Sequence, residues 1–246
     1  MRPRDFLAAM GTADIPHGSR IDSAGNSTGS FMDHLMGAED KMREWGFDDA
    51  LCHAALFHSV YGTEGFQGFT LDVSERDRVR EIIGERAEQI AFLNCVMDRH
   101  SLDTLAAAAA AGRDTGQGSS PIVLQVRPNS PVANSGADET TYELSERDLV
   151  DLMTVHLADH LEGFEHQMNR PDKNWIAHDV EGQRGHWEIP PRGWFGYRRE
   201  AYSAMARAVG GVAEASWKAA LATVPLGCEP ARWVPAPVPI GGASKL

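Results

Sequence analysis

Histidine is the residue type in this chain that is best suited to chemistry, with ten copies in 246 residues. Two of them, His34 and His58, stand among apolar residues in neighbouring segments. A buried imidazole needs partners for both ring nitrogens, and a metal ion with a carboxylate supplies them. The alternative is a buried histidine that bonds a backbone carbonyl, which is the commoner situation for any single histidine.

A second histidine pair lies downstream. His156 and His160 are spaced i, i+4, so they share one face of an expected helix, and Asp159 lies beside them. This spacing can hold a metal ion by itself. The segment does not match the H-E-x-x-H pattern, and histidine pairs are common on exposed helix faces, so the pair alone is a weak indication of a metal site.

The segments that must position these histidines have the pattern of helices. Apolar residues recur every three or four positions, which is typical of an amphipathic helix. The expected helices cover 30–45, 49–61, 74–97, about 106–111 and 145–164. Ser74 and Ser145 each begin a Ser-Glu-Arg-Asp tetrapeptide and are expected N-caps. The helices that carry His34 and His58 are joined so closely that we expect antiparallel neighbours.

The remaining segments complete the expected fold. Residues 122–126 and 140–144 are rich in β-forming residues and predict a small hairpin, whereas the glycine-rich residues 25–29 predict a loop. We expect a last helix over 197–223, bent at Gly210-Gly211. The sequence thus predicts a mostly α protein, with a helical domain over 1–168 and a C-terminal extension over 169–246 packed on it. That extension would hold a lid-like loop, the last helix and a proline-rich tail.

Four motifs carry a resemblance to a known family. They are Ser30-Phe31-Met32-Asp33-His34-Leu35, the segment 51–59, the segment 83–88 and Val155-His156-Leu157-Ala158-Asp159-His160-Leu161. Their order resembles the HD-domain superfamily of helical metal-dependent hydrolases. The pattern is most similar to the hydrolase domain of the stringent-response alarmone synthetase/hydrolases, and the resemblance covers about residues 15–165.

The resemblance implies an HD-domain-like helical bundle and a ligand set. By position, the ligands of one divalent ion (Fe, Zn or Mn) would be His34, His58 and Asp159. His17 and Arg20 match a segment that lines the family's pocket, so they are expected to contact substrate.

One position departs from the family. Ser59 stands where the family has an aspartate after the second histidine, and the places of two further acids hold Gly62 and Thr63. A neutral hydroxyl is a poorer ligand for a hard cation than a carboxylate. The sequence therefore disfavours a dinuclear site and leaves two histidines and one carboxylate, a set used by zinc hydrolases and non-haem Fe(II) oxygenases alike.

The expected chemistry is attack by a metal-activated water on a small polar molecule, as in a hydrolase or hydratase. A bound metal ion would lower the pKa of water to about 7. Glu64 is the expected proton carrier, Tyr61 a second catalytic candidate, and Arg99 a binder of an anionic group. Two alternatives stay open: an Fe(II) oxygenase that uses the same ligands, and an inactive small-molecule binding protein. An aromatic cluster would suit binding or a lid: Trp175, Trp187, Trp194, Phe195 and Tyr197.

The composition of the chain limits the kinds of binding partner that we expect. The 23 basic and 35 acidic side chains give a net charge of −12, which argues against nucleic acid or an anionic membrane as the main partner. The apolar runs fall short of the ~18 residues of a membrane span, and the first residues do not resemble a secretory signal, so we expect a cytoplasmic protein. A small-molecule substrate is the expected partner, and a homo-oligomer stays open.

Overall fold

The computed structural model describes residues 1–21, 27–112, 121–134, 140–168 and 193–223, and they are mostly helical, as the sequence predicts. Besides short 3-10 turns at Thr12–Asp14 and Val73–Glu75, it contains two antiparallel strand pairs. The strands are β1 (Pro16–Ile21), β2 (Ser27–Ser30), β3 (Ile122–Gln125) and β4 (Thr141–Leu144). The helices are α1 (Pro3–Ala9), α2 (Phe31–Glu44), α3 (Asp49–Leu56), α4 (Arg76–Ile83), α5 (Glu85–Val96), α6 (Arg99–Ala110), α7 (Pro131–Asn134), α8 (Glu146–Met168), α9 (Gly193–Val209) and α10 (Gly211–Ala222).

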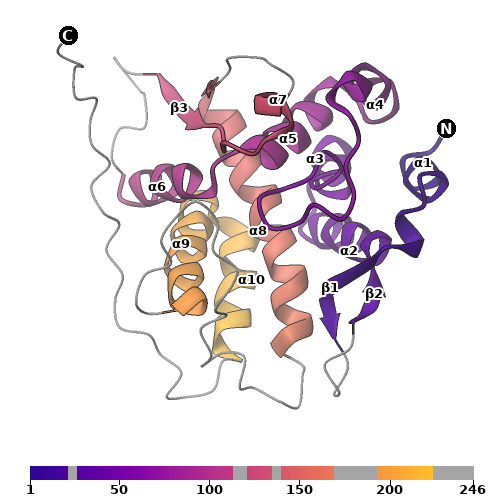
Figure 1. Ribbon diagram of the computed structural model, residues 1–246. Helices are drawn as coiled ribbons and strands as arrows, with labels where there is room; N and C mark the ends of the chain where they lie inside the picture. The colour runs from indigo at the N-terminus through magenta and orange to yellow at the C-terminus, as the bar shows by residue number, and fades with distance from the viewer. Residues whose placement is uncertain (22–26, 113–120, 135–139, 169–192, 224–246) are drawn as a thin grey trace, which may run out of the picture.

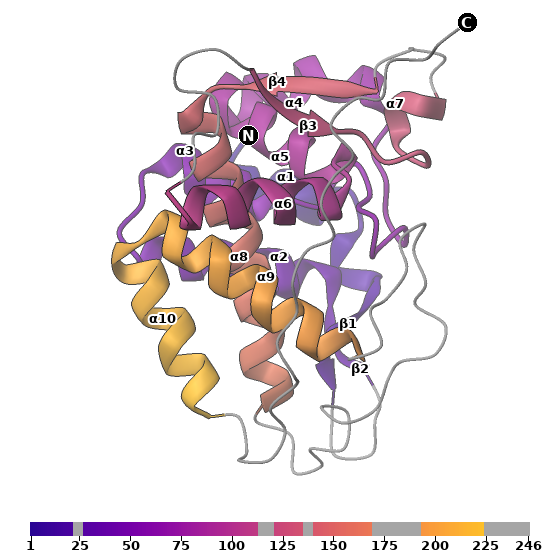
Figure 2. The same cartoon turned by 90° about the vertical axis from the view of Figure 1, so that its left-hand side faces the viewer.

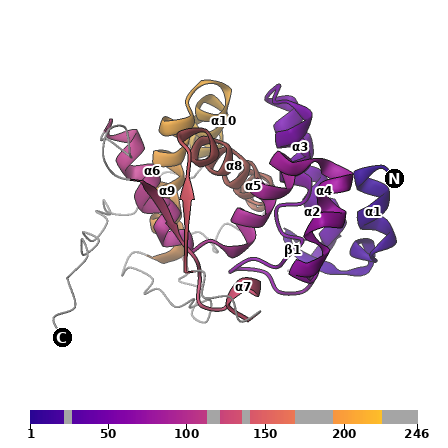
Figure 3. The same cartoon turned by 90° about the horizontal axis from the view of Figure 1, so that it is seen from above.

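Helix α8 runs through the middle of the molecule and contacts helices on both sides (Figure 1). It begins at a reciprocal capping box, in which Ser145 Oγ accepts from the Asp148 amide and Asp148 accepts from the Ser145 amide. Helices α2, α3 and α5 lie on one side of α8, and α9 and α10 on the other; the view from above separates the two groups (Figure 3). Side chains of α8 therefore reach two different sets of neighbours.

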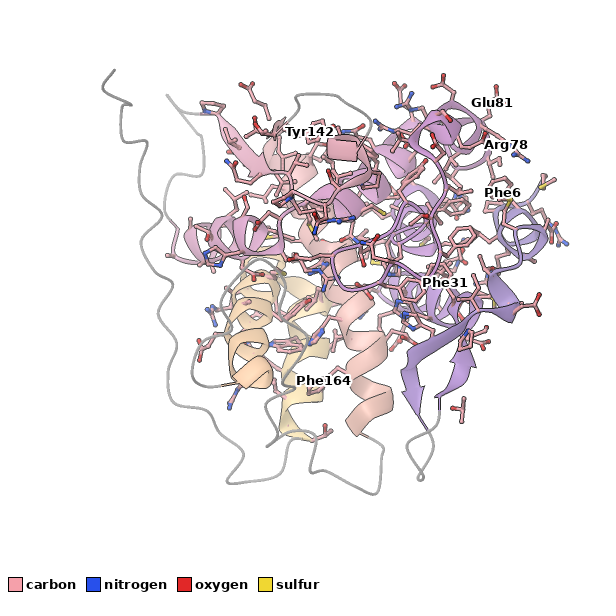
Figure 4. The ribbon with its side chains drawn as sticks, viewed as in Figure 1. Phe6, Phe31, Arg78, Glu81, Tyr142 and Phe164 are labelled. Atoms are coloured by element: carbon pink, nitrogen blue, oxygen red, sulfur yellow. The ribbon has the colours of Figure 1, made fainter. Side chains whose placement is uncertain are left out.

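Helix α2 confirms the helix predicted over 30–45, which carries His34. Ser30 and Asp33 form a capping box at its start, and Phe31, Leu35 and Met42 lie on its buried face. Phe31 is labelled in Figure 4, where it lies at the start of α2 and points into the body of the protein. This face places His34, in the first turns of α2, toward α8.

Helix α3 is shorter than predicted, because it ends at Leu56 rather than near Tyr61. Asp48 caps its start by accepting from the Leu51 amide. After Leu56 the chain continues as tight turns, in which the Val60 amide donates to Phe57. A continued helix would bond the Ala55 carbonyl to the amide four residues on, but this carbonyl accepts from the His58 side chain instead. His58 therefore lies in a turn just beyond the helix.

The prediction of one helix over 74–97 is wrong, since the chain forms α4 and α5 with a break at Gly84. Gly84 has φ +87°, a conformation that glycine adopts without steric cost and that interrupts the helical ladder. The predicted N-cap is also displaced: Asp72, rather than Ser74, accepts the capping bond, from the Ser74 amide.

One predicted hairpin is confirmed and another was missed. Strands β3 and β4 pair antiparallel, with Ile122 opposite Leu144. Strands β1 and β2 form a second hairpin, with Pro16 opposite Ser30, and β2 lies partly in residues 25–29, where the sequence predicted a loop. This segment has too few alternating apolar residues to indicate strands; its contacts with α2 and α8 hold it in place instead.

The C-terminal part differs from the predicted single bent helix. Helices α9 and α10 are separate and meet at Gly210 and Gly211, both at positive φ (Figure 2). Tyr202 and Trp217 are buried in the same apolar core as the residues of α8, and Phe164 packs against Trp217 (Figure 4). The predicted lid-like loop and tail fall at 169–192 and 224–246, outside the described residues.

No helix in the described part of the chain is both long enough and apolar enough to span a bilayer.

Candidate metal centre

Three side chains from distant parts of the sequence meet at one point between α2, the turn after α3, and α8. His34 Nε2 lies 3.1 Å from His58 Nε2, and Asp159 Oδ1 lies 3.2 Å from the first nitrogen and 3.3 Å from the second. The three atoms thus form a nearly equilateral triangle. His34 and His58 are buried, and the Asp159 side chain is 15% exposed, so the aspartate is the most exposed of the three.

The other nitrogen of each imidazole has its own acceptor. His34 Nδ1 lies 2.7 Å from Glu162 Oε2, and His58 Nδ1 lies 2.7 Å from the Ala55 carbonyl oxygen. Because an ionised carboxylate and a carbonyl only accept, each Nδ1 carries a hydrogen. In a neutral ring the Nε2 atom is then a bare lone pair. Two such lone pairs would face each other beside a carboxylate oxygen, an arrangement that a proton or a metal ion between them stabilises.

A proton supplies this cation when no metal ion is bound. Burial lowers the pKa of His34, but hydrogen bonds to Asp159 and Glu162 outweigh burial and raise that pKa to about 9. Burial alone would raise the pKa of Asp159, yet the nearby His58 and His34 hold it well below its usual range. The site is therefore built to stabilise positive charge.

His17 lies directly against this group. Its ring stacks on His34 with 4.1 Å between centroids and 15° between planes, and Phe66 packs edge-on against the His17 ring with 4.8 Å between centroids. Burial and the adjacent His34 lower the pKa of His17 to about 3, so its imidazole is neutral at physiological pH. The group of converging ligand atoms in the described residues consists of His34, His58 and Asp159, and His17 borders this group through its stack on His34.

The other predicted site residues lie in three places. Glu64 Oε2 accepts from the Arg99 amide at 3.4 Å, and the Arg99 guanidinium lies over Gly65, so these two predicted residues are neighbours. The Tyr61 hydroxyl donates to Glu88 Oε1, within a salt-bridge network, rather than to one of the three ligands. The backbone of Arg20 lies in β1, and its side chain falls outside the described part.

The second histidine pair faces away from the triangle. His156 Nδ1 lies 3.1 Å from Asn94 Oδ1, and its Nε2 accepts from the Tyr202 hydroxyl at 3.0 Å. His160 stacks on Tyr202 with 3.8 Å between ring centroids. Asn94 also donates to the His58 carbonyl oxygen at 2.8 Å, so a continuous line of hydrogen bonds joins α9 to the turn that carries His58.

Sequence reasoning missed Glu162 and Asn94. Glu162 had one available signal: it follows Asp159 by three positions, so both carboxylates lie on the same side of α8. Asn94 had none, because a single asparagine in an apolar helix does not reveal its partner. Of the aromatic cluster, the side chains at 175, 187, 194, 195 and 197 lie outside the described part.

Comparison with known proteins adds one match. Residues 9–99 match the model of a domain family of unknown function (DUF6817). This stretch includes His17, His34 and His58 but ends well before Asp159. No curated protein and no solved structure matches the chain. The ligand triangle therefore joins two residues inside the matched stretch with one outside it.

Proposed function

We propose that this protein is a metal-dependent enzyme that binds one divalent ion through His34, His58 and Asp159. The proposed reaction is attack by a metal-activated water on a small polar molecule, as in a hydrolase or hydratase. One observation carries the proposal: two imidazole Nε2 atoms and one carboxylate oxygen converge within 3.3 Å of one another, each from a different element. The HD-like ancestry implied by the sequence motifs stays a prediction.

The spacing of the three atoms supports a metal ion. In a tetrahedral zinc site with bonds of about 2.0–2.1 Å, neighbouring ligand atoms lie about 3.3 Å apart. The edges of this triangle, 3.1, 3.2 and 3.3 Å, agree with that value. Among the described residues, the same three form a group of metal-ligating side chains with all ligand atoms within 4.8 Å.

Charge also favours a dication over a proton. With both imidazoles neutral, Asp159 and Glu162 bring two negative charges to a largely buried cluster. A divalent ion balances both charges, whereas the proton on His34 balances only one. Buried charge is costly unless it is compensated, so the cluster gains more from a dication than from a proton.

Each residue has a defined task in this proposal. A divalent ion, when bound, supplies a Lewis acid that acidifies water. His34 and His58 donate nitrogen ligands whose orientation is fixed by Glu162 and the Ala55 carbonyl. Glu64 carries the proton, and the adjacent Arg99 binds an anionic group of the substrate. His17 forms an uncharged wall beside His34.

The same ligands support a second candidate, a non-haem Fe(II) oxygenase. Two histidines and one carboxylate are the ligand set of that class, and Ser59 leaves the first coordination shell with a single carboxylate. Iron content with oxygen uptake would favour the oxygenase. Zinc or manganese content with metal-dependent hydrolysis of an ester such as p-nitrophenyl acetate would favour the hydrolase.

Elemental analysis of protein purified without chelator tests the proposal. We expect one equivalent of zinc, iron or manganese per chain, lost in His34→Ala and in Asp159→Ala. His53→Ala is the matched control, because His53 lies on α3 near His58 yet is not one of the converging ligands. Metal-free wild-type protein that also fails to bind added Zn²⁺, Mn²⁺ or Fe²⁺, or equal metal content in all variants, would refute the site.

A further inference from the structure

A fourth side chain, Glu162, contacts the triangle from outside. Its Oε2 atom lies 2.7 Å from His34 Nδ1, and the residue is only 4% exposed. It stands on α8, while His34 stands on α2, so the contact joins two helices that pack against each other. The imidazole of His34 is thus held from both edges, by Glu162 at Nδ1 and by the cation position at Nε2.

The backbone of α2 makes room for this carboxylate. Gly37 follows His34 by three positions, on the same face of α2. A Cβ atom at position 37 would lie 2.6 Å from Glu162 Cγ and 2.9 Å from its Oε1. The glycine therefore permits the close approach that brings Glu162 to His34. A larger residue would push the carboxylate out of place.

We infer that Glu162 is the positioning residue of the metal centre and that Gly37 is the packing position that seats it. Glu162 fixes the His34 ring so that Nε2 faces the metal ion, and its charge completes the neutralisation of a dication. Such carboxylate–histidine–metal arrangements raise the basicity of the ligand and lock its tautomer. This inference rests on the proposed metal site and goes beyond it, because the three ligands alone do not require it.

Three variants separate the two contributions of Glu162. Glu162→Ala removes both the acceptor and the charge, whereas Glu162→Gln keeps an acceptor oxygen and removes the charge. Gly37→Ala keeps the carboxylate but displaces it, and alanine is the better helix former, so local helix stability does not suffer. The full chain is used in each case, and the probe is Co²⁺ titrated in competition with a chelator.

Loss of outer-shell partners typically weakens metal binding by about 10- to 100-fold. We expect Co²⁺ affinity to fall about 100-fold in Glu162→Ala and about tenfold in Glu162→Gln and Gly37→Ala. The Co²⁺ absorption spectrum should change as well, because the His34 ring is reoriented. Glu88→Gln is the control: Glu88 is a fully buried glutamate that pairs with Arg76 and Arg80, so its loss affects stability without touching His34.

The outcomes separate this inference from the proposed function. If the wild-type protein binds one Co²⁺ ion and all three variants bind it equally well, with unchanged spectra, Glu162 has a structural role only and the inference is wrong. If the wild-type protein binds no Co²⁺, the proposed function and the inference are both wrong. A drop in affinity of the same size in Glu88→Gln would also overturn the inference, since the effect would then be nonspecific.

Discussion

Binding of a divalent ion should release a proton from His34. Without metal, the hydrogen bonds to Asp159 and Glu162 outweigh burial and raise the pKa of His34 to about 9, so this imidazole is protonated at neutral pH. A metal ion needs the Nε2 lone pair and must displace that proton. Asp159 needs no such step, because its pKa is held well below the usual range by His58 and His34 and its carboxylate is already ionised.

The cost of displacing the proton follows from the difference between the working pH and the pKa of His34. At about pH 7, His34 lies about two units below its pKa, and one unit corresponds to about 1.4 kcal/mol, so proton displacement costs about 3 kcal/mol. Apparent metal affinity should therefore rise about tenfold per pH unit between about pH 6.5 and 9, and about 100-fold from about pH 7 to 9. Above that range the affinity should level off.

Isothermal titration calorimetry with Co²⁺ measures both quantities. Titrations at one pH, in two buffers with different ionisation enthalpies, give the number of protons released, which should be close to one at neutral pH. Titrations at a series of pH values give the change in Co²⁺ affinity per pH unit. A release near zero together with a flat affinity profile would refute the reasoning, because it would show that no proton occupies the triangle in the metal-free protein.

Three further predictions concern stability. The pKa of His34 is higher in the folded protein than its unfolded value of 6.5, so the free energy of unfolding of the metal-free protein should fall by up to about 3 kcal/mol as pH rises from about 6.5 through 9. Urea unfolding at a series of pH values measures this, and saturating Co²⁺ should abolish the decrease. A urea midpoint that does not change with pH in the metal-free protein would contradict the prediction. Tyr202→Phe removes the hydroxyl that donates to His156 and should cost about 1–3 kcal/mol by the same assay while metal stoichiometry stays at one; a neutral effect would disprove that bond's role. Glu88→Ala leaves Arg76 and Arg80 without their buried partner and should cost about 3–5 kcal/mol; thermal unfolding unchanged from wild type would speak against it.

The sequence was most informative where a local signal decides the structure. The capping box predicted at Ser145 marks the start of α8, because a serine with an acid three positions later satisfies amides that the helix leaves open. The same tetrapeptide at Ser74 did not form the predicted cap, since Asp72 takes that role there. The β-forming residues of 122–126 and 140–144 likewise predicted the hairpin that strands β3 and β4 form. Such signals act over a few residues, so they predict an element best where its immediate neighbours decide its start.

Elements that depend on distant contacts could not be predicted in the same way. The β1–β2 hairpin has few apolar residues and is held by α2 and α8, so nothing in its own sequence distinguishes it from a loop. The end of α3 depends on the His58 side chain, which takes the carbonyl of Ala55. The break at Gly84 was visible as a glycine, but a glycine within an apolar pattern is also compatible with a continuous helix.

Helix geometry explains why the two candidate metal groups on α8 are separate. Successive residues of an α-helix turn by about 100°, so Asp159 and Glu162 lie about 60° apart, while His156 and His160 lie about 40° apart. The centres of the two pairs differ by about 110° around α8. The two carboxylates therefore face α2 and His34, and the two histidines face α9 and Tyr202.

This division gives α8 two tasks at adjacent positions. Its carboxylates Asp159 and Glu162 contact the proposed metal centre, and His156 links Tyr202 on α9 to Asn94, which in turn bonds the carbonyl of His58. His58, one of the proposed ligands, is thus tied to α9 through a buried chain of hydrogen bonds. Spacing along the sequence placed His156, Asp159 and His160 on one helix, but only the direction of each side chain separates the proposed metal ligand from the histidines that contact α9.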